Sequence, residues 1–390
     1  MTGKRLESLD ALRGFDLLCL LAVSKLMDAL SDAIDKPWTD NIMECFTHKT
    51  WEGFSSWDLV MPLFMFMAGV AIPYSLARYR THSPITANEC AIASSRDASG
   101  RAALYWRLAR RVALLWLFGM MVQGNLMSLD PSRIYLFSNT LQAIAVGYLF
   151  SAVLFLHTGW KTQLGIAVGL LLAFWAFMEF ITFGSYGGGD YSPHGNLCEG
   201  IDMAVLGRFR DTAEVVDGQV VVKEWYTYTW ILSSMNFIVT VLSGVLAGEV
   251  LRSTMQRGRK TLLLLVAGIA MVALGWTWNA WHPVIKHIWT SSMVLVSSGY
   301  CFLLMGLFYY WIDCRGHNRH LTLLKVYGMN SITAYVVSHV VSFSSISRSL
   351  FHGLEQYVGD YYGFVIQFSN VSILFLILYL MYRNRIFLRV

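Results

Sequence analysis

Long apolar stretches separated by short polar segments run along the whole chain, without the strict alternation of barrel strands. A helix needs roughly 20 mostly apolar residues to cross about 30 Å of hydrocarbon. Ten stretches are long enough, which predicts an all-α polytopic membrane protein with about ten transmembrane helices. The predicted spans are residues 14–30, 58–77, 111–129, 139–157, 163–183, 229–251, 261–281, 289–311, 324–344 and 363–382.

The composition supports this prediction. The 390 residues are 55% hydrophobic and only 14% charged, and the mean hydropathy is +0.48, which excludes an ordinary soluble domain. No linker rich in Pro, Gly or Ser divides the chain. We therefore predict one transmembrane domain over residues 1–390, with an inner basic loop at 78–110 and an outer loop at 184–228.

Lysine and arginine gather in every second inter-span segment, beginning with the segment before the first span. Basic residues near span ends stay in the cytoplasm, so both termini are predicted to be cytoplasmic. The net charge of +5 follows from this bias, and no nucleic-acid partner is predicted. The arginines of the 78–110 loop either serve retention alone or bind a polyphosphorylated ligand.

The loops on the outer side carry other signals. Three glycines at 187–189 and Pro193 favour a folded turn in the 184–228 loop, and a loop of this length often covers a binding site. Cys45 and Cys198 both fall in predicted outer loops, where they either pair or remain free thiols. The cysteines show no metal-ligand spacing, so no metal site is predicted. The first apolar run lacks a small-residue cleavage site and is expected to be a retained span.

Polar side chains within or beside the spans are the candidates for chemistry, because they are costly in hydrocarbon without a partner or a function. Each either bonds to another helix or serves a site. Asp10 and Arg13 are one helical turn apart and are predicted to pair. A row of amides would suit a long polar cofactor arm. The full set is Asp10, Arg13, Asp16, Ser24, Lys25, His48, Asp58, Asn139, Gln142, Glu179, Asn236, Glu249, Asn330, Ser331 and His339.

His48 is the strongest single candidate, because a neutral imidazole is the usual proton acceptor near neutral pH. It precedes the span at 58–77, and either Asp58 or Glu52 is expected to orient it. The alternative is an interfacial loop histidine framed by Trp51 and Trp57.

Eight motifs in one order resemble the transmembrane acyltransferase family of heparan-α-glucosaminide N-acetyltransferase and its shorter bacterial relatives. Each motif is short, and the ordered set carries the resemblance. They are Arg5-Leu-Glu-Ser-Leu-Asp-Ala-Leu-Arg-Gly14, His48-Lys-Thr-Trp-Glu-Gly53, Asp58-Leu-Val-Met-Pro-Leu-Phe, Leu141-Gln142, Ser192-Pro-His-Gly-Asn-Leu197, Asn236 in Ser-Met-Asn, Gly244-Val-Leu-Ala-Gly248, and Gly328-Met-Asn-Ser-Ile332.

The resemblance implies that cytosolic acetyl-CoA donates an acetyl group to the amine of a glucosamine-type sugar on the outer side. It also implies roles for particular residues. His48 matches the active-site histidine, with Asp58 beside it. The family's catalytic asparagine falls on Ser24, a shorter donor, so either Ser24 fills that role or Asn236 or Lys25 takes it over. The implied contacts of acetyl-CoA are Arg111, Arg110, Arg107, Gln142 and Asn330.

The predicted mechanism is direct transfer, in which His48 removes a proton from the amine; the alternative is an acetyl-histidine intermediate. Two rival functions remain: an O-acetyltransferase of an envelope glycan, and a proton-coupled solute transporter using His48 and Lys25. We expect a multi-pass protein of the bacterial inner (plasma) membrane, in contact with lipid and with an amino-sugar or glycan acceptor. Because the family is often dimeric, a homodimer is also expected.

Overall fold

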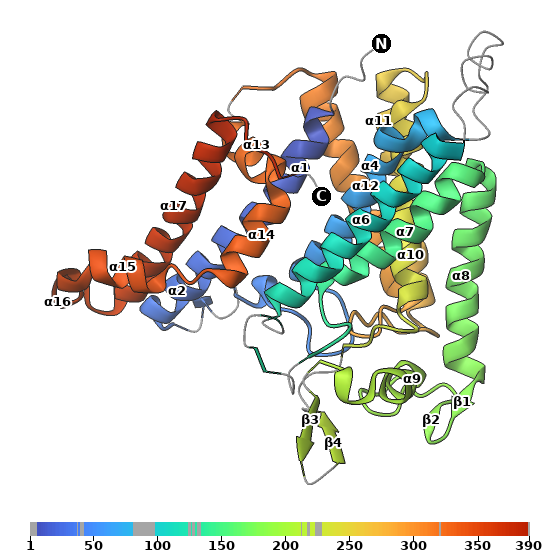
Figure 1. Cartoon of the computed structure of the whole chain (residues 1–390), viewed down its shortest axis with the longest axis horizontal. Helices are drawn as coiled ribbons and strands as arrows, with labels where there is room; N and C mark the ends of the chain where they lie inside the picture. Colours follow the sequence, from blue (N-terminus) through green and yellow to red (C-terminus); the bar gives the residue numbers. More distant parts are fainter. Residues whose placement is uncertain are drawn as a thin grey trace.

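A computed structural model gives the arrangement of the helices. It describes residues 6–36, 38–39, 43–80, 98–123, 126, 129–130, 134–211, 213–216, 219–222, 228–319 and 321–388. In these residues nearly all regular structure is helical, and the strands form two short hairpins (Figure 1). The prediction of an all-α polytopic membrane protein is confirmed.

Seven helical segments among the described residues are long and apolar enough to cross a membrane. They correspond to seven of the ten predicted spans. The segments are Ser56–Tyr79, Thr140–His157, Trp160–Phe180, Ser234–Arg252, Arg257–Trp278, Ser291–Cys314 and His352–Arg383.

The remaining three predicted spans fall on helices that are not among these seven segments. The first lies on α1 (Glu7–Leu18), a π-helical turn and α2 (Ser24–Ile34), which together carry several charges. The third lies on α6 (Ala98–Val122), which begins well before the predicted start, so residues 98–110 of the expected inner loop are helical. Residues 81–97 of that loop lie outside the described residues. The ninth is divided into α13 (Thr322–Met329) and α14 (Ser331–Val340).

One bundle forms the larger part of the molecule. It consists of α4 (Val60–Leu76), α6, α7 (Thr140–His157), α8 (Trp160–Phe180), α10 (Ser234–Arg252), α11 (Arg257–Trp278) and α12 (Ser291–Phe308). Within this bundle α4 and α10 approach closely, since a Cβ on Gly69 would lie 2.0 Å from the Val241 carbonyl oxygen. Only glycine permits that contact, and it fixes α4 against the centre of the bundle.

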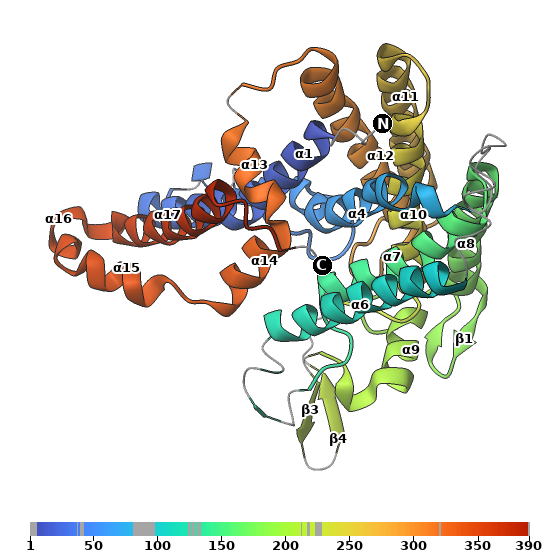
Figure 2. The same ribbon diagram turned by 45° about the horizontal axis from the view of Figure 1, so that its top comes forward.

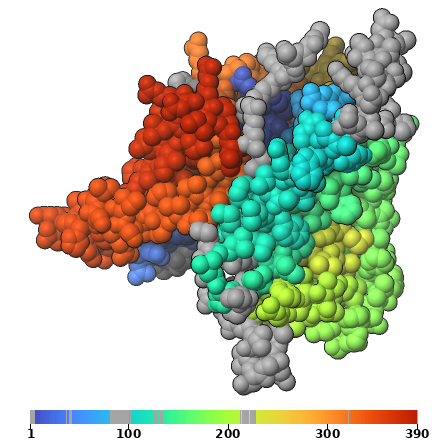
Figure 3. All heavy atoms as spheres, viewed as in Figure 1, coloured from blue at the N-terminus to red at the C-terminus, as the bar shows by residue number. Residues whose placement is uncertain are grey.

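A second group of helices packs beside this bundle. It contains α1, α2, α13, α14, α15 (Ser344–Leu350), α16 (Glu355–Val358) and α17 (Tyr362–Arg383). Figure 2 shows α15, α16 and α17 extending away from the larger bundle. In the space-filling view of Figure 3, α15 and α16 form the projection at the left. The two groups meet where α1 contacts α4 and α12, and where α14 contacts α6.

The described residues of the 184–228 loop form a cap at one end of the bundle (Figure 1). It contributes β2 (Tyr186–Gly187), paired with β1 (Thr182–Phe183), then α9 (Leu197–Leu206), β3 (Ala213–Val216) and β4 (Gln219–Val222). Asn196 caps α9 by accepting a hydrogen bond from the Glu199 amide at 2.9 Å. The Ser192–Leu197 motif is therefore built into the start of a helix.

Candidate active site

A capping box at the start of the second predicted span holds Asp58 in place. The Asp58 carboxylate accepts a hydrogen bond from the Ser55 amide through Oδ2, at 2.9 Å, and its exposed fraction is 1%. This leaves the other carboxylate oxygen, Oδ1, for a different partner. That partner is His48, whose Nδ1 lies 2.8 Å from Asp58 Oδ1.

This contact decides how the imidazole is used. A carboxylate only accepts hydrogen bonds, so the Asp58 contact favours the neutral tautomer with the proton on His48 Nδ1 and the lone pair on Nε2. The His48 side chain remains 43% exposed, so part of the ring can be reached by a ligand. Of the two carboxylates considered from the sequence, Asp58 makes the contact, whereas Glu52 forms an isolated backbone bridge with Ile285.

Lys286, which is not among the candidates chosen from the sequence, completes this cluster. Its Nζ lies 3.3 Å from Asp58 Oδ1, 2.9 Å from His48 Nδ1 and 3.4 Å from His48 Nε2. Burial lowers the pKa of Lys286 to about 8, and the Asp58 charge opposes that shift. The signal that marks it is a lysine in the short 279–290 segment between two apolar helices.

Backbone contacts bring His48 and Lys286 together across 238 positions of sequence. The Gly53 amide donates to the Val284 carbonyl at 2.8 Å, beside the bridge between Glu52 and Ile285. The rings of Trp51 and His287 stack with centroids 5.3 Å apart. The loop before α4 and the loop before α12 are thus joined at the site.

A cavity of about 230 Å³ surrounds the exposed edge of His48. Lys286 lines it together with Tyr228, Asn139 and Tyr335. Tyr228 is positioned by His287, because their ring centroids are 4.4 Å apart and the Thr229 amide donates to the His287 carbonyl at 3.1 Å. Burial lowers the pKa of His287 to about 4, so this neighbour is uncharged at neutral pH.

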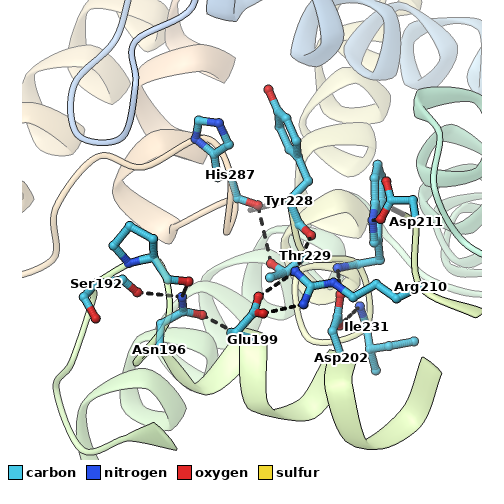
Figure 4. A network of polar contacts seen from close by, with 12 residues as sticks. Ser192, Asn196, Glu199, Asp202, Arg210, Asp211, Tyr228, Thr229, Ile231 and His287 are labelled. Carbon is cyan, nitrogen blue, oxygen red and sulfur yellow. Dashed lines mark hydrogen bonds and ion pairs between the residues drawn. The ribbon is translucent and has the colours of Figure 1, made fainter. Parts of the chain in front are cut away.

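The folded 184–228 cap supports that wall of the cavity from behind (Figure 4). Arg210, fully buried, forms a two-pronged ion pair with Glu199, and its Nη2 also donates to the Tyr228 carbonyl at 3.3 Å. Asp202 accepts hydrogen bonds from the amides of Trp230 and Ile231 at 2.7 and 2.9 Å. The cap therefore fixes the 228–231 segment.

A second cavity, of about 250 Å³, adjoins the first. Phe64, Thr140 and Tyr335 line both cavities, so these side chains form the boundary between them. Arg13 and Arg111 line the second cavity, whereas His48 is not among the described residues that line it. The Asp10–Arg13 pair predicted from the sequence is present at 3.9 Å.

Two buried polar groups beside this second cavity suit a donor molecule such as acetyl-CoA. Arg111 packs over the Tyr148 ring at 4.1 Å, and its buried Nε has no hydrogen-bond partner among the described residues. Asn330 is 1% exposed, and neither side-chain polar atom finds a partner in the described part of the chain. Its neighbours Met329 and Ser331 line the cavity. Such orphaned groups fit phosphate and amide groups of a ligand.

The structure places the other predicted cofactor contacts elsewhere. Arg107 and Arg110 are exposed on α6, and neither is among the described residues lining the second cavity. Gln142 is fully buried as part of a capping box, where its Oε1 accepts from the Ser138 and Asn139 amides and its Nε2 donates to the Leu136 carbonyl. Its amide is already engaged in starting α7.

Two predicted catalytic donors also lie apart from His48. Ser24 donates to the Leu20 carbonyl at 3.2 Å within its own helix. Asn236 is fully buried and donates to the Trp289 carbonyl at 2.7 Å, anchoring the segment that precedes α12. Neither is among the described residues that line the His48 cavity. Cys45 is exposed, Cys198 is buried and both are free, so the unpaired alternative holds.

The fold and the site define a polytopic membrane protein with a histidine, a carboxylate and a lysine at the end of two adjoining cavities. No protein-family model matches the chain. Among curated proteins, the chain is 26% identical over 384 residues to heparan-alpha-glucosaminide N-acetyltransferase of Homo sapiens. The match covers 85% of this chain and 52% of the human protein, so the chain spans about half the length of that curated relative. The chain is a distant relative of that N-acetyltransferase.

Proposed function

We propose that the protein is a membrane acyltransferase that moves an acetyl group from acetyl-CoA to the amine of a glucosamine-type sugar. The observation that carries this proposal is the placement of His48 between Asp58 and Lys286, next to a cavity that continues to Arg111. The distant relationship to an N-acetyltransferase supports the same reaction class. The predicted orientation places His48 on the outer side and Arg111 on the cytoplasmic side.

The residues divide the work between binding and proton transfer. Arg111 and Arg13 supply positive charge for the phosphates of acetyl-CoA, and Asn330 supplies an unpaired amide near the path of its arm. Acetyl-CoA supplies an activated acetyl thioester to this site. Phe64, Thr140 and Tyr335 stand where the two cavities meet, which is where the acetyl group must reach the acceptor.

His48 acts as the general base. Its Nε2 takes a proton from the acceptor amine as the amine nitrogen forms a bond to the carbonyl carbon, and Asp58 stabilises the resulting imidazolium. The carbon–sulfur bond then breaks, and His48 returns the proton to the leaving thiolate. The Lys286 ammonium lies close enough to stabilise the negative charge that develops on the carbonyl oxygen.

The decisive experiment is acetyl transfer by the purified protein. Labelled acetyl-CoA is incubated with glucosamine, with amino-sugar oligosaccharides and with glycans that offer only hydroxyl groups. We expect label on the amine of the amino sugars. Label that stays wholly on CoA across the panel would overturn the enzyme, and label only on hydroxyl groups would indicate O-acetylation.

His48→Ala tests the assignment of the base. Loss of a positioned general base typically lowers the rate by about 10²- to 10⁴-fold. We expect kcat to fall within that range while KM for acetyl-CoA changes little, because His48 is not in the donor cavity. Full activity in this variant would show that another residue is the base.

A further inference from the structure

A third cavity lies on the far side of His339 from the catalytic cavity. It encloses about 460 Å³ between α2, the end of α14, residues 341–344 and α17, which is within the range of about 300–1,000 Å³ typical of ligand sites. His339 lines both this cavity and the one around His48. Figure 1 shows α2, α15 and α16 on the left, at the lower end of the second group of helices.

The lining of this cavity is polar where a lipid-facing surface would be apolar. Lys25, Asp28, Asp32 and His339 are exposed, so a ligand can reach their charged and polar groups from the surface. The polar lining residues supply hydroxyl, amide and charged groups from α2, α14, α15 and α17 and from the loop between α14 and α15. The polar lining residues are Lys25, Asp28, Asp32, Ser338, His339, Ser342, Ser344, Gln367 and Asn370.

Negatively charged side chains outnumber positively charged ones in this lining. Lys25, Asp28 and Asp32 follow one another at spacings of three and four along α2, so they share one face of the helix. Two carboxylates stand against one ammonium. The cavity therefore favours hydroxyl and ammonium donors and disfavours anions.

The other side chains are arranged to form hydrogen bonds. His339 Nδ1 lies 2.8 Å from the Tyr335 carbonyl, which only accepts, so Nε2 of the neutral ring remains an acceptor at the boundary of the two cavities. Asn370 is oriented by Ser347, which donates to its Oδ1 at 2.7 Å. Asn370 Nδ2 donates to Ser344 Oγ and to Gln367 Oε1, each at 3.2 Å, so Asn370 positions Gln367 and leaves the Gln367 Nε2 group as a donor toward the cavity. Amides, hydroxyls and carboxylates held in this way suit the hydroxyl groups of a sugar.

We propose that this cavity is a glycan subsite, formed by Lys25, Asp28, Asp32, His339, Gln367 and Asn370. It binds the sugar unit next to the glucosamine whose amine reacts at His48. It selects an uncharged or amine-bearing sugar over a sulfated or carboxylated one. This inference rests on the proposed acetyl transfer and adds the chemical class of the acceptor.

The test compares three acceptors in the acetyl-transfer assay: glucosamine, a disaccharide of two glucosamine units, and that disaccharide with a sulfate on the second unit. We expect the unsulfated disaccharide to have a KM about tenfold below that of glucosamine, the size of effect that one or two net hydrogen bonds produce. We expect the sulfated disaccharide to lose that advantage.

Variants of the cavity then separate the two sugar units. Gln367→Ala and Asp32→Asn should raise KM for the disaccharide by about tenfold and leave kcat and KM for glucosamine unchanged. Asp32→Lys should improve use of the sulfated disaccharide, a gain that misfolding cannot produce. Asp35→Asn is the matched control, because it removes one negative charge from the exposed end of the same helix outside the cavity lining.

Each outcome has one meaning. Equal effects of Gln367→Ala and Asp32→Asn on glucosamine and on the disaccharide would overturn the subsite while acetyl transfer stands. A sulfated disaccharide used as well as the unsulfated one would overturn the charge selection. Absence of transfer to every acceptor would overturn the proposed function, and the subsite with it.

Discussion

At the scale of single residues, the three groups around His48 depend on one another. Asp58 favours the proton on His48 Nδ1, and Lys286 places a positive charge within 3.4 Å of both ring nitrogens. Burial makes the Lys286 ammonium easier to deprotonate than an ordinary lysine, because the charged form loses its hydration. The charge on Lys286 is therefore present at neutral pH and is lost at mildly alkaline pH.

This gives a prediction for the pH dependence of the reaction. As pH rises through about 8, Lys286 loses its proton, and kcat/KM should fall because the charge on the carbonyl oxygen is no longer stabilised. Lys286→Arg stays charged to much higher pH. The pH at which kcat/KM falls on the alkaline side should therefore be higher in this variant than in the wild type. Lys286→Met should lower kcat by about 10²- to 10³-fold at pH 7. The measurement is kcat/KM between pH 6 and 10.

Lys49 provides the control for this prediction. It stands next to His48 in sequence but is exposed and pairs with Glu44 at 2.8 Å. Lys49→Met should leave the pH of this alkaline fall unchanged. If kcat/KM of Lys286→Arg fell at the same alkaline pH as in the wild type, a group other than Lys286 would cause that fall.

At the scale of elements, the apolar pattern predicts a helix well where the helix is continuous and lipid-facing. The spans at 163–183 and 363–382 correspond closely to α8 and α17. The break at Asn330 has no apolar signature, because residues on both sides remain apolar and the backbone turns only at one position, with φ −119° and ψ 37°. Contacts between helices depend on tertiary packing, so the order of apolar and polar residues along the chain does not reveal them.

The candidate site likewise contains residues that lie near one another in the sequence and one residue that only the fold brings to them. His48 and Asp58 are ten residues apart and could be linked from the sequence, whereas Lys286 reaches them only through the bridge between two loops. Gln142 has a structural use that the prediction of a cofactor contact did not consider. The spacing of Asn139 and Gln142 is that of a capping box, and the structure uses both side chains to begin α7.

The cap contributes to stability through its buried ion pair. Glu199→Ala would leave Arg210 charged and without its partner in a fully buried position, which typically costs about 3–5 kcal/mol. We expect a clear drop in melting temperature in detergent, together with lower activity because Arg210 also contacts the Tyr228 carbonyl. Glu44→Ala, which breaks the exposed pair with Lys49, should leave the melting temperature unchanged. Equal melting of wild type and Glu199→Ala would show that the pair is not stabilising.

At the scale of the whole molecule, the two adjoining cavities link sites formed by helices from both groups. Arg13 on α1 and Arg111 on α6 line one cavity, and His48 and Lys286 line the other, with Tyr335 of α14 at the boundary. Phe387 and Leu388, which follow α17, also line the Arg111 cavity. The second group of helices thereby contributes to the proposed donor site as well as to the proposed glycan subsite.

The continuity of these cavities predicts which arginine holds the donor. Arg111→Ala should raise KM for acetyl-CoA by about tenfold or more, because a charge-assisted hydrogen bond to phosphate is lost. Its effect on acetyl-pantetheine, which lacks the nucleotide, should be small. Arg110→Ala removes the same charge one position earlier, where the side chain is exposed and outside the cavity lining, and should leave both KM values unchanged. If Arg110→Ala and Arg111→Ala had the same effect, the arginines would act as a diffuse basic surface, and the cavity that reaches His48 would not be the path of the donor.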